Sequence, residues 1–309
     1  MSLNKIIFLS KIFILLYLVN LSYELNNEIN DNPPETIELS YNNNEITISD
    51  NCYSKIYKVI NNFGSNNFLL INTKSISHRR GPYLYITNNE NFNVKNDNYD
   101  YTLIHESSNG NKIALPQDYS NTFYLKVSCQ DSCQSQSIYF DSVEEIDINE
   151  GEKFYFNSKD KDYSFNINVN SDIKNFDIAL IITGENINQI SMEVNGKEAS
   201  LISEKVLSLF LIGITTNKIT TQINAPKDSN FIFYFQILKN DDKYKNLDVY
   251  LNEDHYYYLL PNTNINFNLK YFNKLLTKKY ELSISSFFEF NANIFNDEQG
   301  YSKKKYKYK

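Results

Sequence analysis

The sequence has few of the residues on which most catalytic and cofactor-binding motifs depend. Its 309 residues include 3 His, 3 Cys, 8 Gly and no Trp. So few glycines provide no loop that could cradle phosphate groups, and the Gly-x-Ser-x-Gly motif of serine hydrolases is absent. We therefore expect no catalytic residues and no enzymatic activity in this chain, unless a catalytic domain follows residue 309.

The three histidines do not form a recognisable metal site. His105 and Glu106 begin like a zinc-protease helix, but the second histidine is missing and Gly110 interrupts the helix. His78 lies in a polar turn beside two arginines, and His255 lies in an expected strand. None has a second ligand two or four residues further along, so we expect no metal ligands.

The sequence also lacks a concentration of charge of one sign. The formal net charge of −7 is spread along the chain, and no basic stripe suits nucleic-acid binding. Two acidic turns, with Asp160 and Asp162 and with Asp241 and Asp242, are candidates for Ca²⁺. They lack the ligand spacing of a calcium-binding loop. We expect solvated turns and no cofactor, with Ca²⁺ as the alternative.

Only one long apolar run is present, and it lies at the N-terminus. "IIFLSKIFILLYLVN" follows a short basic start and is shorter than the roughly 20 residues of a membrane span. We expect a signal peptide over 1–22, a linker over 23–44, and a secreted, extracellular or luminal protein. A signal anchor is the alternative. Membrane contact is expected only through such an anchor or through a part that follows residue 309.

The three cysteines are interpreted as structural in an oxidising compartment. Cys129 and Cys133 flank a tight turn that can bring them within disulfide distance. Pairing of Cys52 with one of the two remains an alternative, and either arrangement leaves one free thiol.

The residues that are abundant favour strands. There are 25 Tyr and 21 Phe, and with Ile and Thr they suit a pleated, half-buried surface. We expect strands over 67–73, 82–87, 163–169 and 176–183 and only one helix, over 271–280. Alternation over 163–169 predicts Phe165, Ile167 and Val169 on a buried face and Asn166 and Asn168 facing water. The segments 176–183 and 206–214 lack alternation, so we expect central strands covered on both faces.

Internal similarity predicts tandem domains. "PQDYSNTFYLKV" from Pro116 resembles "PKDSNFIFYFQI" from Pro226, and this alignment places Phe123–Val127 opposite Phe233–Ile237. "EIDINEGEKFYF" from Glu145 has a later counterpart from Leu247 and a weaker earlier one from Glu45. We expect an all-β protein of jelly-roll-like tandem β-sandwiches: repeat one over 45–141, repeat two over 145–245 and a partial third β-repeat over 247–309. The short third repeat suggests a truncated chain or a small terminal cap.

The stretch "INEGEKFYFNSKDKDYSFNINVNSDIKNFDIALIIT" resembles the pre-peptidase C-terminal domain family. The similar features are Gly151 before the strand 154–156, the alternating strand 165–169, and Asp177 opening an apolar strand. The double-Asp signature of the family is reduced here to Phe176-Asp177. The resemblance implies an accessory β-sandwich of secreted proteins and supplies no catalytic residues.

These observations favour a non-catalytic, secreted or surface-exposed tandem β-sandwich protein with an adhesive, ligand-binding or structural role. The expected partner is an extracellular protein or a glycan. The alternative is an accessory region or ectodomain of a larger secreted hydrolase or membrane protein that continues beyond residue 309.

Overall fold

In the part of the chain that the computed structural model describes, the regular structure consists of strands and one 3-10 turn, η2 (Ile187–Gln189). The structure describes residues 34–48, 54–63, 68–74, 83–90, 99–103, 111–116, 118–128, 137–158, 161–172, 174–238, 244–250 and 264–270. The expected signal peptide, the expected helix over 271–280, and all cysteines and histidines lie outside these residues. None of the described helical segments has the length and apolar character needed to cross a membrane.

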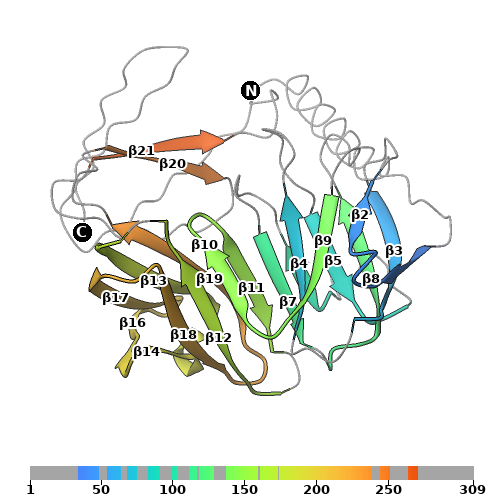
Figure 1. Cartoon of the computed structure of the whole chain (residues 1–309), viewed down its shortest axis with the longest axis horizontal. Coiled ribbons are helices and arrows are strands. Elements are labelled where there is room, and N and C mark those ends of the chain that lie inside the picture. Colours follow the sequence, from blue (N-terminus) through green and yellow to red (C-terminus); the bar gives the residue numbers. More distant parts are fainter. Residues whose placement is uncertain are drawn as a thin grey trace, which may run out of the picture. The chain divides into compact units, whose positions relative to one another are not determined.

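The first sandwich consists of an outer sheet of five strands packed on four strands of a larger sheet (Figure 1). The first outer sheet has the order β1 (Glu35–Leu39), β3 (Ser54–Asn61), β8 (Thr122–Ser128), β5 (Tyr83–Thr87) and β6 (Tyr101–Leu103). The facing strands are β7 (Asn111–Pro116), β4 (Phe68–Lys74), β9 (Ser137–Val143) and β2 (Glu45–Thr47). Alternate residues of both sheets, such as Leu125, Ile71 and Phe140, form the first core.

The second sandwich repeats this plan. The second outer sheet has the order β10 (Ile146–Asn149), β12 (Tyr163–Asn170), β18 (Lys218–Ala225), β14 (Ser191–Val194) and β15 (Lys197–Glu198). The facing strands are β16 (Ser200–Ser203), β17 (Val206–Ile214), β13 (Phe176–Glu185), β19 (Asn230–Leu238) and β11 (Lys153–Asn157). Phe154, Phe165, Ile182 and Phe233 lie in the second core. The expected all-β class of tandem sandwiches is confirmed.

Strand order and direction match between the two sandwiches. In each outer sheet the first strand pairs in parallel with its neighbour, β1 with β3 and β10 with β12, and the other pairings are antiparallel. The counterpart of β8 is therefore β18, and that of β9 is β19. The sequence alignment of Phe123–Val127 with Phe233–Ile237 is thus wrong by one strand. Short strands with alternating aromatic residues resemble one another in sequence, so sequence similarity alone did not show which strand of the second sandwich corresponds to β8.

The two sandwiches share one continuous sheet of nine strands, the central sheet. The joint between them is a parallel pairing of β11 with β7, in which Tyr155 lies beside Ile113. Both residues contact the first core, whereas Phe154 and Phe156 belong to the second core. Because neighbouring residues of a strand point to opposite faces, the two outer sheets cover opposite faces of the central sheet.

The expected boundaries and faces differ from the structure at three places. β1 lies inside the segment expected to be a linker, so the first sandwich begins ten residues before Glu45. Asn168 was expected to face water, but it is 1% exposed and its amide hydrogen-bonds within the protein. β13 is buried on both faces as expected, whereas β17 is not, because Phe210 and Ile212 are exposed.

Beyond the sandwiches, β20 (Tyr244–Tyr250) and β21 (Asn264–Lys270) form a separate two-stranded sheet. The sandwiches belong to one compact unit (Met1–Leu247 with Asp254–Asn266), and a second unit comprises Asp248–Glu253 with Phe267–Lys309.

At Gly184 the backbone of β13 lies close to the backbone of β19. A Cβ atom there would overlap the backbone carbonyl oxygen of Asn230, which cannot rotate away as a side chain would. We expect Gly184→Ala to lower the free energy of unfolding by roughly 1–3 kcal/mol, which is the usual cost of overpacking. Urea denaturation measures this change. Ser200→Ala on the exposed strand β16 is the control and should change it by less than about 0.5 kcal/mol. Equal effects of the two variants would contradict the close approach.

Candidate functional site

A groove of about 580 Å³ lies where the two sandwiches meet. This volume is within the range of small-ligand sites, roughly 300–1,000 Å³. Both sandwiches contribute to its lining, which consists of Phe68, Pro116, Asp118, Glu144, Glu145, Lys161, Tyr163, Ser164, Phe165 and Asn166. This inter-sandwich groove is the candidate site.

The strands place apolar groups in the groove beside a polar rim. Phe68 and Pro116 are paired at the ends of β4 and β7, and the ring of Phe165 on β12 lies 5.6 Å from that of Phe68 in an edge-on contact. Phe68 and Phe165 are buried in the second core, so these side chains are held in place. The alternation of β12 then directs Ser164 and Asn166 outward, where both are exposed.

A charged cluster spans the groove from one sandwich to the other. Lys161 forms an ion pair with Asp118, and the hydroxyl of Tyr163 donates to the same carboxylate at 3.0 Å. The Lys161 ammonium also lies 5.1 Å from the centre of the Tyr163 ring. Burial alone would raise the pKa of Asp118. The hydrogen bonds from Lys161 and Tyr163 and the charge of Lys161 outweigh burial and hold this pKa below its ordinary value.

Two glutamates between β9 and β10 form the acidic side of the rim. Glu145 accepts a hydrogen bond from the buried Asn168 amide at 2.7 Å and lies 3.6 Å from the Lys218 ammonium. Glu144 is exposed. With Asp118, the rim carries three carboxylates against Lys161, which leaves the groove net negative and favours ligands with hydroxyl or cationic groups.

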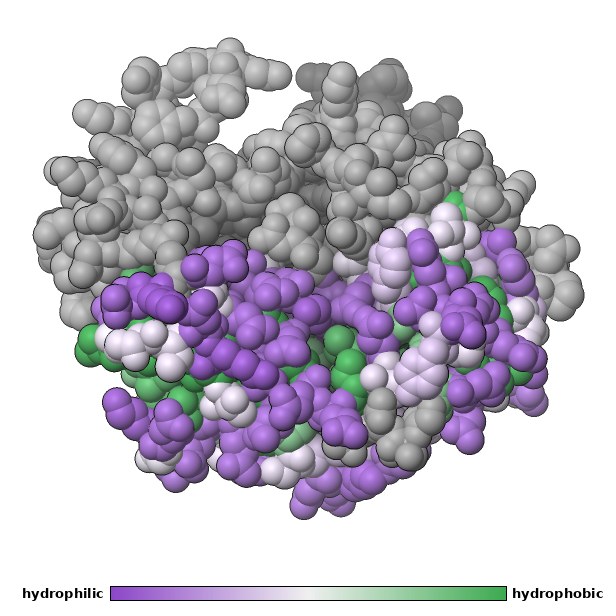
Figure 2. Space-filling view, in the orientation of Figure 1, coloured by the Kyte–Doolittle hydropathy of each residue, from purple (hydrophilic) through white to green (hydrophobic). Residues whose placement is uncertain are grey.

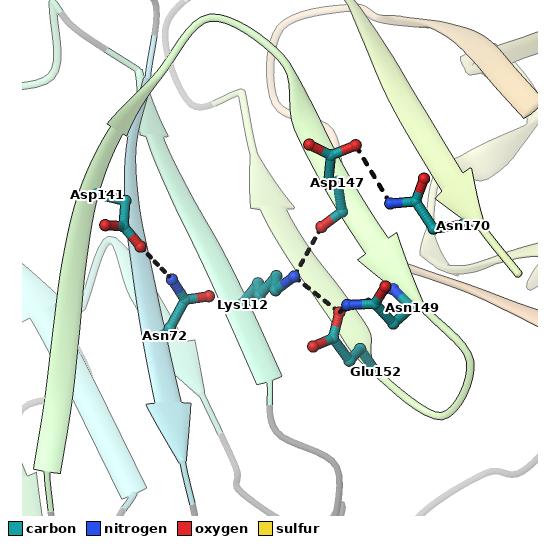
Figure 3. A network of polar contacts seen from close by, with 7 residues as sticks. All are labelled: Asn72, Lys112, Asp141, Asp147, Asn149, Glu152 and Asn170. Atoms are coloured by element: carbon teal, nitrogen blue, oxygen red, sulfur yellow. Dashed lines mark hydrogen bonds and ion pairs between the residues drawn. The ribbon is translucent and has the colours of Figure 1, made fainter. Parts of the chain in front are cut away.

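At the joint, Lys112 on β7 connects the central sheet to the edge of the second outer sheet (Figure 3). Its ammonium donates to the backbone carbonyl of Asp147 and to Glu152, each at 2.7 Å. Glu152 also accepts from the backbone and side-chain nitrogens of Asn149, which closes the turn between β10 and β11. The Lys112 and Glu152 side chains are each only 14% exposed, so this pair is more shielded from water than a surface salt bridge.

On the opposite face, Asn157 at the end of β11 is held by the first sandwich. Its amide donates to the carbonyl of Asp100, and its own carbonyl accepts from the hydroxyl of Tyr101, both at 2.8 Å. The Asp100 carboxylate in turn accepts from Tyr119 at 2.7 Å. Burial, then the hydrogen bond and charge of Asp100, raise the pKa of Tyr119. The orientation of the groove walls is therefore fixed on both faces of the joint.

A second polar feature lies on the outer face of the first outer sheet. Lys126 is 7% exposed, and its ammonium lies 5.7 Å from the ring centre of its cross-strand neighbour Tyr85. Burial lowers the pKa of Lys126 to about 8 and raises that of Tyr85. No carboxylate forms an ion pair with Lys126 among the described residues, so its charge carries an uncompensated desolvation cost.

Most of the sequence-predicted site residues cannot be placed. Cys52, Cys129, Cys133, Asp160, Asp241 and Asp242, like the histidines, lie outside the described residues. Asp162 is described, and its carboxylate accepts the backbone N–H of Lys227 at 2.8 Å. Within the described ranges, no three His, Cys, Asp or Glu side chains gather in a way that could hold a metal ion.

Sequence reasoning did not find the groove because its residues come from distant segments. Asp118 lies in the repeated stretch that begins at Pro116, Lys161 lies inside the candidate calcium turn, and Tyr163 begins the expected strand that follows it. The sole sequence signal was that turn, and its residues contribute a lysine and a tyrosine rather than metal ligands.

Comparisons with known proteins give no family assignment. No family model and no curated protein matches the chain. Among solved structures, the CUB1-EGF-CUB2 domain of human MASP-1/3 aligns at 7% identity and a TM-score of 0.19, covering 65% of this chain and 97% of that one. The description of the fold rests on the sheets of this chain alone.

Asp118 gives a pH-dependent contribution to stability. Because its pKa is lowered on folding, its stabilisation is present above the ordinary carboxyl pKa of about 3.9 and is lost as the pH falls through the lowered value. We expect Asp118→Asn to lower the free energy of unfolding at pH 7 by less than about 1 kcal/mol, since its side chain is half exposed. In urea unfolding, the difference from wild type should disappear at strongly acidic pH. Asp172→Asn on an exposed loop should be neutral, and a difference that persists in acid would contradict the assignment.

The charge of Lys126 destabilises the folded state, whereas the charge of Asp118 stabilises it. Between about pH 8 and its ordinary pKa near 10.4, the unfolded chain holds a proton that the folded chain has lost, so the free energy of unfolding rises with pH there. We expect Lys126→Met to be more stable than wild type at pH 7 by about 1 kcal/mol, with the gap narrowing above pH 8 in thermal or urea unfolding. Lys227→Met on an exposed turn is the control. A Lys126→Met variant less stable than wild type at pH 7 would contradict this prediction.

Proposed function

We propose that this chain is a non-catalytic, secreted or surface-exposed binding protein whose inter-sandwich groove takes a short saccharide. The observation that carries the proposal is the composition of the groove. Phe68, Pro116 and Phe165 form a fixed, largely buried apolar part of the lining, next to the exposed hydrogen-bonding side chains of Ser164 and Asn166. Small-ligand sites usually combine an apolar lining with a few placed polar groups. Here polar and charged side chains make up the larger part of the lining, which suits a ligand rich in hydroxyl groups.

The rim chemistry favours hydroxyl groups as ligands. Glu144 and Asn166 are exposed, and within the described part of the chain their side chains make no hydrogen bond, so they are available to accept and donate. A sugar presents hydroxyl groups to such side chains and C–H faces to apolar ones. Because the groove is net negative, an acidic saccharide would be a poor ligand, and we propose a neutral saccharide as the ligand.

A binding role fits the state of the charged groups better than a catalytic one. Asp118 is already occupied by Lys161 and Tyr163, whose hydrogen bonds and charge hold it ionised. An ionised, paired carboxylate is a poor general acid at neutral pH. Export is supported by the N-terminal apolar run, which the sequence presents as a signal peptide.

The test is a glycan-array screen of the purified full chain, followed by titration calorimetry with the saccharide that binds most tightly. We expect Glu144→Gln and Asn166→Ala each to weaken binding about tenfold, the effect of about 1.4 kcal/mol, while thermal stability is unchanged. Glu204→Gln, an exposed glutamate of the β16–β17 turn and not a groove residue, is the matched control.

The salt dependence distinguishes the ligand class. Binding of an uncharged saccharide should be insensitive to ionic strength, whereas binding of a basic peptide should weaken as salt rises. Strong salt dependence, or saccharide binding that none of the groove variants alters, would overturn the proposed function.

A further inference from the structure

Exposed polar side chains cover the outer face of the second outer sheet. Alternate residues of β12 and β18 point away from the second core, and among them Ser164, Asn166, Gln222 and Asn224 are exposed. Figure 2 shows mainly hydrophilic side chains where Figure 1 places β10, β12 and β18. We call these four residues the amide face. None of them carries a formal charge, so the amide face suits an uncharged partner.

The corresponding face of the first sandwich has a different character. β3 and β8 are the counterparts of β12 and β18. The outward side chains of β8 include Tyr124 and Lys126, which are only 8% and 7% exposed. An exposed face of amides and hydroxyls is therefore not a requirement of the repeated fold. It is a property of the second sandwich.

Within the amide face, the side chains form two cross-strand pairs, Ser164 with Asn224 and Asn166 with Gln222. Hydrogen bonds hold the first pair. The Ser164 hydroxyl donates to Asn224 at 2.6 Å, and the Asn224 amide donates to Ser191 on β14 at 2.9 Å. This row of three side chains is ordered before any ligand arrives.

The pair of Asn166 and Gln222 lies between this row and a second ordered row. In that second row, the Thr220 hydroxyl donates to Asn168 at 2.9 Å, and the Asn168 amide donates to Glu145 at 2.7 Å. Within the described part of the chain, the side chains of Asn166 and Gln222 make no hydrogen bond. Since an amide both donates and accepts, this pair can bind hydroxyl groups of a ligand.

The amide face is continuous with the inter-sandwich groove. Ser164 and Asn166 belong to both. β10 pairs with β12 only from Ile167 to Asn170, so the groove adjoins the first half of β12. Gln222 lies one strand further on, about 5 Å away by the usual strand spacing, and does not line the groove. A ligand that extends from the groove to Gln222 must therefore be longer than one that the groove alone holds.

We propose that the ligand is a linear neutral polysaccharide, with one part of its chain in the groove and the next part lying across β12 and β18 on the amide face. This inference rests on the saccharide-binding role proposed above. The amides of Asn166 and Gln222 bind hydroxyl groups of neighbouring sugar units. A disaccharide occupies the groove and does not reach Gln222.

The test is titration calorimetry of the purified full chain with dimers and hexamers of glucose, mannose, galactose and N-acetylglucosamine. For the sugar that binds most tightly, we expect the dissociation constant of the hexamer to be at least about tenfold below that of the dimer. Gln222→Ala should remove most of this difference by weakening binding of the hexamer alone, whereas Asn166→Ala should weaken binding of both. Gln189→Ala is the matched control, because Gln189 is also exposed but lies on η2, which packs against β13 and β17.

Two outcomes overturn this inference and leave the proposed function intact: a hexamer that binds no more tightly than its dimer, or a hexamer whose advantage Gln222→Ala does not reduce. A chain that binds none of these saccharides also overturns the inference, and the wider glycan array then decides the proposed function. Because Gln222 is exposed, its substitution should not disturb folding, which thermal unfolding checks. Gln222→Thr, with a residue favoured in strands, is the second variant and should weaken hexamer binding in the same direction.

Discussion

The parallel pairing of β7 with β11 is the constraint on which the arrangement of both sandwiches depends. The pairing itself is short, but it fixes which face each outer sheet can cover. With Ile113 and Tyr155 on one face and Phe154 on the other, the cores must lie on opposite faces of the central sheet. Lys112 and Asn157 then secure the joint from the two faces. The groove exists because this joint brings the end of one sandwich beside the start of the next.

The predictable part of the fold is the local part. Alternation located β12 closely, because side-chain burial in a strand has a period of two that the sequence displays directly, and a continuous apolar run located β13. Strand pairing is not local, and several short aromatic strands fit one position equally well. The sequence therefore revealed the repeat, but the alignment matched β8 with β19 instead of with its counterpart β18. Asn168 shows the same limit, since its burial depends on hydrogen-bond partners from other parts of the chain, Glu145 and Thr220.

The candidate site was less predictable than the fold. Cysteines, histidines and acidic turns are recognisable in isolation, so they dominated the sequence interpretation. Asp118 and Tyr163 have no distinctive spacing, because 45 positions separate them and only the joint brings their oxygens together. The exposure of Phe210 and Ile212 was hidden for a similar reason. Their segment is apolar throughout, so the sequence does not distinguish these exposed positions from the buried ones beside them.

The order of synthesis gives the joint a further consequence. β2 near the start of the first sandwich pairs with β9, about ninety residues later, so that sandwich can close only after most of its chain has left the ribosome. At that stage β7 already has its partner β4 on one side, but β11 has not yet been made. The nascent first sandwich therefore has an open sheet edge on β7 for a time. During that time, pairing with other chains competes with pairing to its own β11. The short connection from β9 through β10 to β11 limits how long that interval lasts.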